Sequence, residues 1–226
     1  MEQIGFIGVY DKKDLLLNVA NLMSKLNKRV LIVDATIMQR LRYIVPKISA
    51  TPTYISEYNS VDVAVGFMNL GGIANYLGTN TINYDYVLID TDNPQTLNSF
   101  MLQNSKKNFF VTSYDEFELQ RSLEIFAGLR GQIKLSKIIV SSDINNKHDE
   151  YLKKIFSIYP IEWGEEKIEF ADTDNDRKST LINQLLKQIE FKNYTSGYKD
   201  MLEYLTSLIL EGIIEQANIR KMIRKK

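Results

Sequence analysis

Short, almost wholly apolar runs alternate along this chain with longer segments in which apolar residues recur every three or four positions. The apolar runs predict strands at residues 4–9, 29–34, 84–90, 108–112, 136–141 and 158–163. The segments with helical spacing predict helices at residues 14–27, 96–103, 116–129, 148–157 and 179–189. Strands that are apolar throughout need cover on both faces, and they pair in parallel when helices connect them. The pattern therefore predicts an α/β fold with a doubly wound, mostly parallel sheet and helices on both faces.

Two stretches in the first half of the chain have a less regular pattern. Residues 35–60 are mixed and contain Pro46 and Pro52, which predicts a loop. Residues 61–77 combine small residues with helical spacing. We expect a short helix there, broken near Gly71 and Gly72, because glycine weakens a helix interior.

The last part of the chain predicts one long amphipathic helix over residues 201–223, with Leu202, Leu205, Leu208, Ile209 and Ile213 facing inward. Strands and helices alternate over the whole length, and no low-complexity linker interrupts them. Residues 1–226 are therefore expected to form a single domain with an amphipathic helix at about 200–223 near its C-terminus.

Composition excludes several classes of protein. The 28 basic and 28 acidic residues cancel, so no strong field draws the chain to nucleic acid, and DNA is not an expected partner. The absence of cysteine excludes disulfides and thiolate metal sites. No signal peptide is visible, and the apolar runs are far shorter than the ~20 residues of a membrane span. We therefore expect a cytoplasmic protein.

Polar residues and a glycine follow several of the predicted strands. They are Gly8, Asp34, Asp90 and Ser141. In a doubly wound sheet, ligands bind outside the carboxyl ends of the strands, so these residues are expected on one rim. The first strand also leads through a glycine and a polar loop into a helix, and the N-terminus of such a helix favours a phosphate group.

Four signals in this order resemble the ParA/MinD group of P-loop ATPases, including its CpaE/TadZ pilus-assembly branch. They are the first loop with its helix, the block RVLIVDA at residues 29–35, the block YDYVLIDT at 84–91, and the FVT strand at 110–112 with its helix. The 84–91 block is the most specific. The resemblance covers about the first 160 residues and implies a ParA/MinD-like P-loop NTPase fold.

The register of the first loop follows from an asparagine in the helix after it. The family's loop reads K-G-G-x-G-K-[ST], and its first helix carries an Asn six residues after the second lysine. Asn18 therefore places that lysine at Lys12 and the motif on residues 7–13.

Measured against this motif, the first loop is degenerate. The family's first lysine, which reaches the nucleotide of a dimer partner, is Ile7, and two loop glycines are replaced by Val9 and Asp11. A side chain at a glycine position restricts the backbone and crowds a phosphate, and an aspartate also repels it. Lys13 stands where a hydroxyl would bind Mg²⁺, and lysine has no acceptor for a metal. Thr36 replaces the second Asp of the family's D-x-D, which helps to position the attacking water.

The resemblance also assigns roles to residues that are retained. Asp90 occupies the position of the Walker B carboxylate, and Ser141 the position of a base-reading asparagine in many relatives. Lys12 and Lys13 can still contact phosphate. The predicted nucleotide-binding set is Gly8, Asp11, Lys12, Lys13, Asp34, Asp90 and Ser141. We predict no catalytic and no metal-binding residue, and a cofactor that is either absent or ATP bound weakly without its usual magnesium ligand.

These departures favour a pseudo-ATPase over an enzyme. By analogy with the CpaE/TadZ branch, the prediction is a protein that positions or scaffolds a pilus, secretion or conjugation apparatus at the cell envelope. Its partners would be proteins of that apparatus, and it would form a homodimer or a heterodimer with an active relative. The alternatives are an active, deviant ATPase that dimerises with nucleotide, and a plasmid or chromosome partition protein.

The basic C-terminus leaves two interpretations open. Five of the last seven residues are basic, and Ile219, Met222 and Ile223 lie between them and just before them. Such a helix could contact the inner face of the membrane, as in MinD-like relatives. The alternative is a packed terminal helix whose basic end is solvated and complements its dipole.

Overall fold

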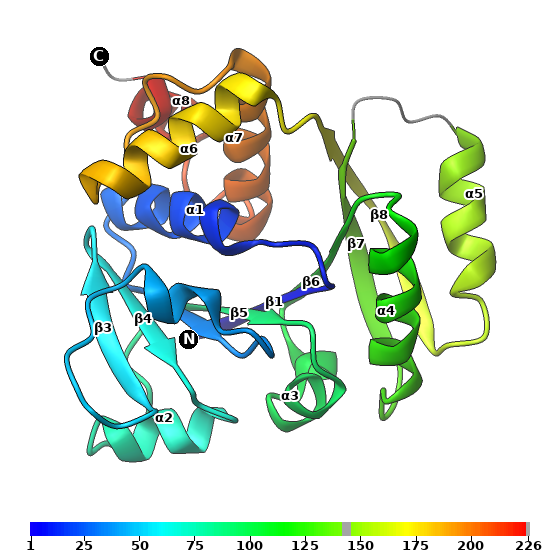
Figure 1. Ribbon diagram of the computed structural model, residues 1–226, viewed down its shortest axis with the longest axis horizontal. Coiled ribbons are helices and arrows are strands. Elements are labelled where there is room, and N and C mark those ends of the chain that lie inside the picture. The colour runs from blue at the N-terminus through cyan, green and yellow to red at the C-terminus, as the bar shows by residue number, and fades with distance from the viewer. Residues whose placement is uncertain (142–145, 225–226) are drawn as a thin grey trace.

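The computed structural model describes residues 1–141 and 146–224, which build one eight-stranded sheet flanked by helices (Figure 1). The strands are β1 (Glu2–Ile7), β2 (Val30–Asp34), β3 (Tyr54–Tyr58), β4 (Val61–Val65), β5 (Tyr86–Thr91), β6 (Lys107–Thr112), β7 (Ile133–Val140) and β8 (Ile161–Phe170). Their order is β3-β4-β2-β5-β1-β6-β7-β8, and only β3 and β4 pair antiparallel. The predicted doubly wound, mostly parallel sheet is confirmed.

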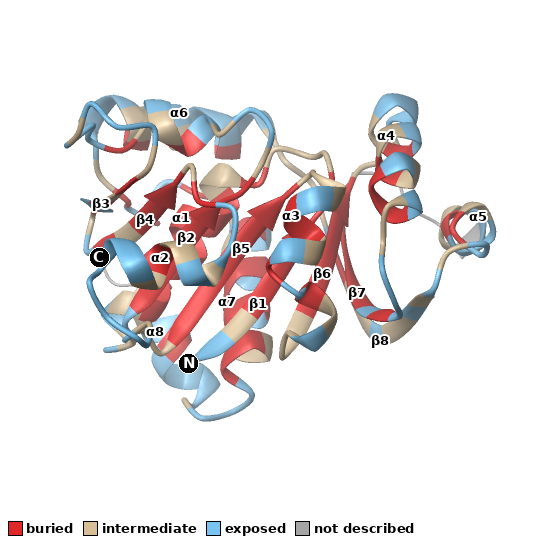
Figure 2. Cartoon of the chain, turned by 90° about the horizontal axis from the view of Figure 1, so that it is seen from below, coloured by how far each residue is buried: buried red, intermediate tan, exposed pale blue. Residues whose placement is uncertain are grey.

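Helices cover both faces of this sheet. They are α1 (Lys13–Lys25), α2 (Leu70–Tyr76), α3 (Pro94–Ser99), α4 (Glu116–Ala127), α5 (Asn146–Ile155), α6 (Asp174–Leu186), α7 (Ser196–Leu210) and α8 (Gln216–Arg224), with 3-10 turns η1 (Arg40–Tyr43) and η2 (Leu102–Asn104). One apolar core lies between the sheet and α1, α7 and α8, and a second lies between the sheet and α2 to α5. The strands β2 and β5 are therefore buried throughout, and Figure 2 shows the buried residues concentrated in the sheet.

The short helix predicted within residues 61–77 is confirmed only at 70–76, and the loop predicted over 35–60 is wrong at 54–58, which form β3. Residues 61–65 form β4, which pairs in parallel with β2 and in antiparallel with β3. Asn59 and Ser60 join β3 to β4 with φ of 52° and 62°, the left-handed geometry of a tight hairpin turn. The helix α2 begins only after Asn69, whose side chain accepts a hydrogen bond from the Gly72 amide, and it runs through Gly71 and Gly72.

The single long helix expected at about 200–223 is also wrong, because two helices fill that range. Helix α7 ends at Leu210, and Glu211 and Gly212 follow with φ of 48° and 73°. Left-handed residues of this kind end helices. The chain then folds back so that α8 packs against α1 and α7, and Ile213, expected to face inward, is 62% exposed.

The apolar side of α8 faces the interior. Ile219 and Ile223 are buried in the same core as α1 and α7, and Met222 packs against it. The apolar residues on which a membrane contact depended are therefore used inside the protein, which favours the packed-helix interpretation. The lysines at 225 and 226 lie outside the described residues. Among the helices of the described chain, none has the length and apolar character needed to cross a membrane.

Candidate functional site

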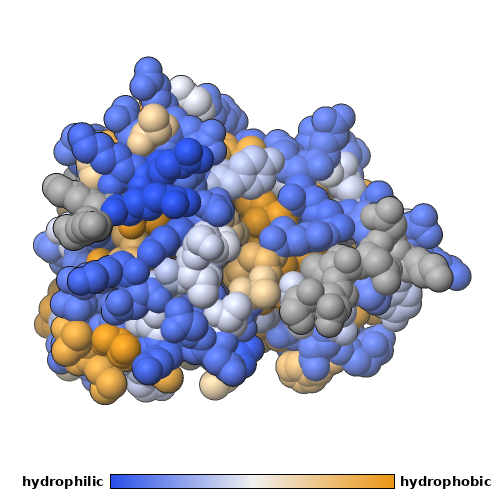
Figure 3. Space-filling model, turned by 90° about the horizontal axis from the view of Figure 1, so that it is seen from above, coloured by the Kyte–Doolittle hydropathy of each residue, from blue (hydrophilic) through white to orange (hydrophobic). Residues whose placement is uncertain are grey.

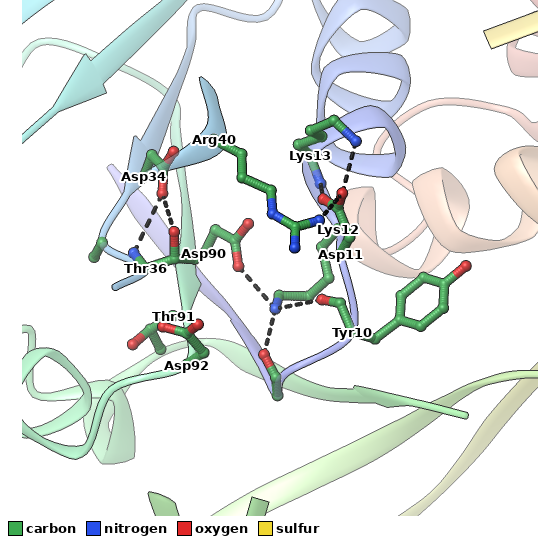
Figure 4. A network of polar contacts seen from close by, with 12 residues as sticks. Tyr10, Asp11, Lys12, Lys13, Asp34, Thr36, Arg40, Asp90, Thr91 and Asp92 are labelled. Carbon is green, nitrogen blue, oxygen red and sulfur yellow. Dashed lines mark hydrogen bonds and ion pairs between the residues drawn. The ribbon is translucent and has the colours of Figure 1, made fainter. Parts of the chain in front are cut away.

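Most of the predicted site residues meet at the carboxyl ends of the central strands. Asp11, Lys12 and Lys13 follow β1, whereas Asp34 ends β2 and Asp90 lies near the end of β5. These five residues line one cavity of about 320 Å³. Figure 4 shows Lys12 reaching toward Asp90 and Lys13 toward Asp11, whereas Asp34 is directed at Thr36.

Ser141 does not line that cavity. It follows β7, two strands away from β1, and its amide donates a hydrogen bond to the Phe170 carbonyl at 3.0 Å. The structure therefore brings six of the seven predicted positions to the first loop and leaves Ser141 beside β8.

Gly8 is held by the backbone around it. Its φ is +134°, and a Cβ atom there would lie 2.2 Å from the Val111 carbonyl oxygen. Its amide donates to the Thr91 carbonyl at 3.1 Å, so the loop leaves the sheet close against β5 and β6. A side chain would break this approach, because only glycine adopts the conformation without strain.

Lys12 is 2% exposed, and its side chain folds back into the loop. The ammonium donates hydrogen bonds to the carbonyls of Gly8 at 2.5 Å and Tyr10 at 3.0 Å. Its Nζ also lies 2.9 Å from Asp90 Oδ1 (Figure 4). Three oxygens of the protein itself thus neutralise and solvate this cation, which makes its burial possible.

Asp90 is the most strongly perturbed carboxyl group of the cavity. It is 4% exposed, and burial raises its pKa to about 7, with a further contribution from the charge of Asp34 and opposition from Lys12. A buried carboxylate is poorly solvated, so the carboxyl group stays protonated up to a higher pH than an exposed aspartate does.

The Asp11 carboxylate lies at the N-terminus of α1. Its Oδ1 accepts a hydrogen bond from the Lys13 amide at 3.2 Å, and its Oδ2 lies 2.7 Å from Lys13 Nζ and 2.5 Å from an Arg40 nitrogen. Although burial opposes ionisation, the hydrogen bonds from Lys13 and Arg40 hold the pKa of Asp11 below its ordinary value. An internal carboxylate therefore takes the amide and the two cations that a phosphate at this helix end would use.

Asp34 explains how Arg40 reaches the site. Its Oδ1 accepts from the Thr36 hydroxyl at 2.6 Å, and its Oδ2 accepts from the Leu41 amide at 2.9 Å. These bonds fold residues 35–41 over the end of β2 and carry Arg40 to Asp11. Burial raises the pKa of Asp34 despite these hydrogen bonds. Sequence reasoning missed Arg40, because nothing in residues 35–60 indicates which side chain returns to a loop 29 positions earlier.

The arrangement does not fit a magnesium nucleotide. A phosphate at the α1 N-terminus would meet Asp11, and Lys13 offers no oxygen where a metal-binding hydroxyl would be needed. Lys13 is instead paired with Asp11 and, at 2.8 Å, with Asp14. Within residues 1–141 and 146–224, no group of three or more His, Asp or Glu side chains is placed to hold a metal ion.

A strand, a loop and a helix near the centre of a mostly parallel sheet, with Asp34 and Asp90 at the ends of β2 and β5, define a doubly wound α/β fold whose ligand site lies at the carboxyl ends of the strands. Comparison with solved structures narrows this class. The chain is similar to a ParA family ATPase from Chlorobium tepidum TLS, with a TM-score of 0.56, 16% identity, and coverage of 92% of this chain and 98% of that one.

Two further solved structures agree with this likeness. The MinD cell division protein of Aquifex aeolicus has a TM-score of 0.56 at 14% identity, covering 94% of this chain and 98% of that one. A candidate plasmid partition protein from Borrelia burgdorferi B31, bound to AMPPNP, has a TM-score of 0.51 at 15% identity, covering 95% and 100%. The chain thus has the ParA/MinD-type fold. Neither a protein-family model nor a curated protein matches its sequence.

Proposed function

We propose that this chain is a ParA/MinD-fold protein that does not hydrolyse ATP and that positions or scaffolds other proteins. The observation that carries the proposal is the Asp11 carboxylate, held at the N-terminus of α1 between Lys13 and Arg40. With this internal anion in place, the positive charges of Lys13 and Arg40 are neutralised without a nucleotide.

A nucleotide phosphate at this site would compete with the Asp11 carboxylate for the same hydrogen-bond donors. An incoming phosphate would have to break the contacts of Asp11 with Lys13 and Arg40, and it would then lie beside a second anion. It would also find Lys12 bonded to two loop carbonyls and paired with Asp90. Each of these rearrangements reduces the affinity for ATP.

Hydrolysis has a further requirement. Phosphoryl transfer depends on positioning and on charge neutralisation by a metal ion and cationic groups. Here the hydroxyl position of the loop is Lys13 and the water-positioning aspartate is Thr36. Losing one stabilising group of this kind costs on the order of a hundredfold in rate. The combined losses support a protein that has kept the fold for its shape.

The proposed setting is the cell envelope, where the protein would position part of a pilus, secretion or conjugation apparatus. This setting is supported by the resemblance of the loop and strand blocks to the CpaE/TadZ branch, an argument from fold-level analogy. Its test is the position of a fluorescent fusion in cells. We expect discrete foci or a polar site at the envelope, whereas diffuse signal would contradict a scaffolding role there.

The loss of nucleotide chemistry is tested by calorimetry and phosphate release with ATP and Mg²⁺. We expect the native chain to show no turnover and a dissociation constant weaker than about 1 mM. The Asp11→Asn variant should bind ATP at least about tenfold more tightly, because one repulsive charge is removed from the α1 N-terminus. Asp200→Asn, which changes an exposed aspartate on α7, is the matched control and should behave like the native chain.

Robust hydrolysis by the native chain, abolished by Lys12→Ala, would overturn the proposal and favour the active ATPase. Salt-dependent retention on DNA would instead favour a partition protein.

A further inference from the structure

Helix α6 buries polar side chains and exposes apolar ones. The residues that it buries are polar, namely Asp176, Ser179 and Asn183, with Asp176 only 1% exposed. Three of its leucines face solvent instead: Leu181 is 59% exposed, Leu185 is 81% exposed and Leu186 is 61% exposed. In an ordinary surface helix the leucines face the core.

The buried side of α6 is fixed by hydrogen bonds to the connection between α6 and α7. Asp176 accepts from the Thr195 amide at 2.8 Å and from the Thr195 hydroxyl at 2.9 Å. Ser179 Oγ lies 2.9 Å from the Asn193 carbonyl, and Asn183 donates to the Glu190 carbonyl at 2.9 Å. Rotating the helix to bury the leucines would leave these polar groups unpaired in the interior, which is costly. The exposure of the leucines is therefore built into the fold.

Leu181, Leu185 and Leu186 form what we call the leucine ridge. Residues four apart lie above one another on a helix, so Leu181 and Leu185 make a continuous apolar edge to which Leu186 adds width. Hydrophobic atoms gather at the corner of the face in Figure 3 where α6 ends, in surroundings that are mainly hydrophilic. A ridge of this form fits between the side chains of another helix.

Positive charge flanks the leucine ridge. Lys178 lies one turn before Leu181, Lys187 follows Leu186, and both are exposed. Within residues 1–141 and 146–224, neither ammonium takes part in an ion pair, whereas the nearby Arg177 is paired with Asp172. Two lysines without acidic partners beside exposed leucines favour an acidic ligand.

The same charges argue against a second copy of this chain. Antiparallel packing of α6 against another α6, with Leu181 of one copy on Leu185 of the other, would bring Lys178 of one copy beside Lys187 of its partner. Like charges so placed repel each other. A membrane surface is also a poor match, because a helix that lies on lipid presents a longer apolar face than three leucines.

We propose that the leucine ridge, with Lys178 and Lys187, docks an acidic amphipathic helix of another protein. The partner would present apolar residues at helical spacing, flanked by Asp or Glu that reach the two lysines. An interface centred on three leucines is small, so it belongs to the transient class. Leu181 also lines a cavity with Tyr10, Asp11 and Lys13, so the ridge begins beside the first loop. The proposal holds whether or not ATP binds at that loop.

The test uses two synthetic helical peptides with the same leucine stripe, one flanked by Glu and one flanked by Lys, and measures binding to the full chain by fluorescence anisotropy. We expect the Glu-flanked peptide to bind and the Lys-flanked peptide to bind at least about tenfold more weakly. The double variant Leu181→Ser/Leu185→Ser should lose about tenfold or more of the affinity for the Glu-flanked peptide. Ile158→Ser, at a side chain that is 81% exposed outside α6, is the matched control and should bind as the native chain does.

Because the leucines are exposed, both variants should keep the native thermal unfolding midpoint, which shows that lost binding is not lost folding. Failure of the Glu-flanked peptide to bind up to about 1 mM would overturn the proposal. Two other results would also overturn it: a ridge-dependent dimer in sedimentation, which assigns the surface to a second copy, and ridge-dependent binding to phosphatidylserine vesicles, which assigns it to lipid. Peptide binding and ATP binding are measured in separate titrations with different variants, so this test and that of the first loop fail independently.

Discussion

At the level of single residues, the first loop has exchanged external partners for internal ones. Lys12, which the resemblance aligned with a phosphate-binding lysine, directs its ammonium to Gly8, Tyr10 and Asp90. Asp11 provides the anion at the helix N-terminus that a ligand would otherwise supply. A loop satisfied in this way is stable without a ligand, because none of its buried charges is left unpaired.

The buried Asp90 predicts a specific pH dependence of stability. Its folded pKa, raised by burial to about 7, lies above the value in the unfolded chain, so between about pH 4 and pH 7 the folded protein holds a proton that the unfolded chain releases. The stability that this group contributes is fully present below the unfolded pKa and is lost as pH rises through the folded pKa. The slope approaches about 1.4 kcal/mol per pH unit.

Asp90→Asn removes this titration, so urea unfolding from about pH 5 to about pH 8 should show the wild type losing stability relative to the variant. Carboxylates with lowered pKa, such as Asp11 and Asp149, titrate at lower pH and are common to both proteins. A pH-independent difference between wild type and variant would contradict the raised pKa of Asp90.

At the level of elements, α8 is fastened to α7 by one buried carboxylate. Glu203 on α7 is 2% exposed, and Arg220 on α8 binds it through two nitrogens, each 2.9 Å from a different carboxylate oxygen. Together with Ile219 and Ile223, this pair holds the C-terminal helix against the core. The basic residues that first indicated a membrane contact therefore include one with a structural role.

Arg220→Ala should destabilise the fold, because it leaves the buried Glu203 carboxylate without its cation. The natural comparison is Arg224→Ala on the same helix, where the partner Asp200 is 60% exposed and the expected loss is only about 0–1 kcal/mol. Urea denaturation of both variants measures the difference. Equal losses would show that the burial of Glu203 has no energetic consequence.

At the level of the whole molecule, a ParA/MinD-type fold is combined with a first loop whose charged side chains are paired within the protein. If the first loop is closed as described, adding ATP and Mg²⁺ should change neither the mass nor the shape of the protein in solution. Sedimentation velocity with and without about 1 mM ATP tests this expectation. A shift from monomer to dimer on adding ATP would show that the loop still works as a switch.

Elements of the fold could be predicted where the apolar pattern within the segment itself was clear. The parallel strands at the centre are continuous runs of Val, Ile and Leu, and burial on both faces dictates that composition. The β3–β4 hairpin was not predicted because the segment Val61–Val65 is short and rich in small residues. Only its pairing with β2 decides that it is a strand. The break between α7 and α8 was not predicted because Ile213, Ile214, Ile219 and Ile223 continue the apolar pattern past Gly212.

The sequence by itself determined the parallel strands β1, β2, β5, β6 and β7 and the presence of Lys12, Asp34 and Asp90 at the rim of the sheet, since these follow from local periodicity and from the ends of the apolar runs. Only the tertiary structure decided that Arg40 returns to Asp11, that α8 faces inward and that α6 turns its leucines outward. These outcomes depend on which distant groups compete for the same hydrogen bonds and the same buried space. Such competition is settled by packing between elements, which a local pattern does not record.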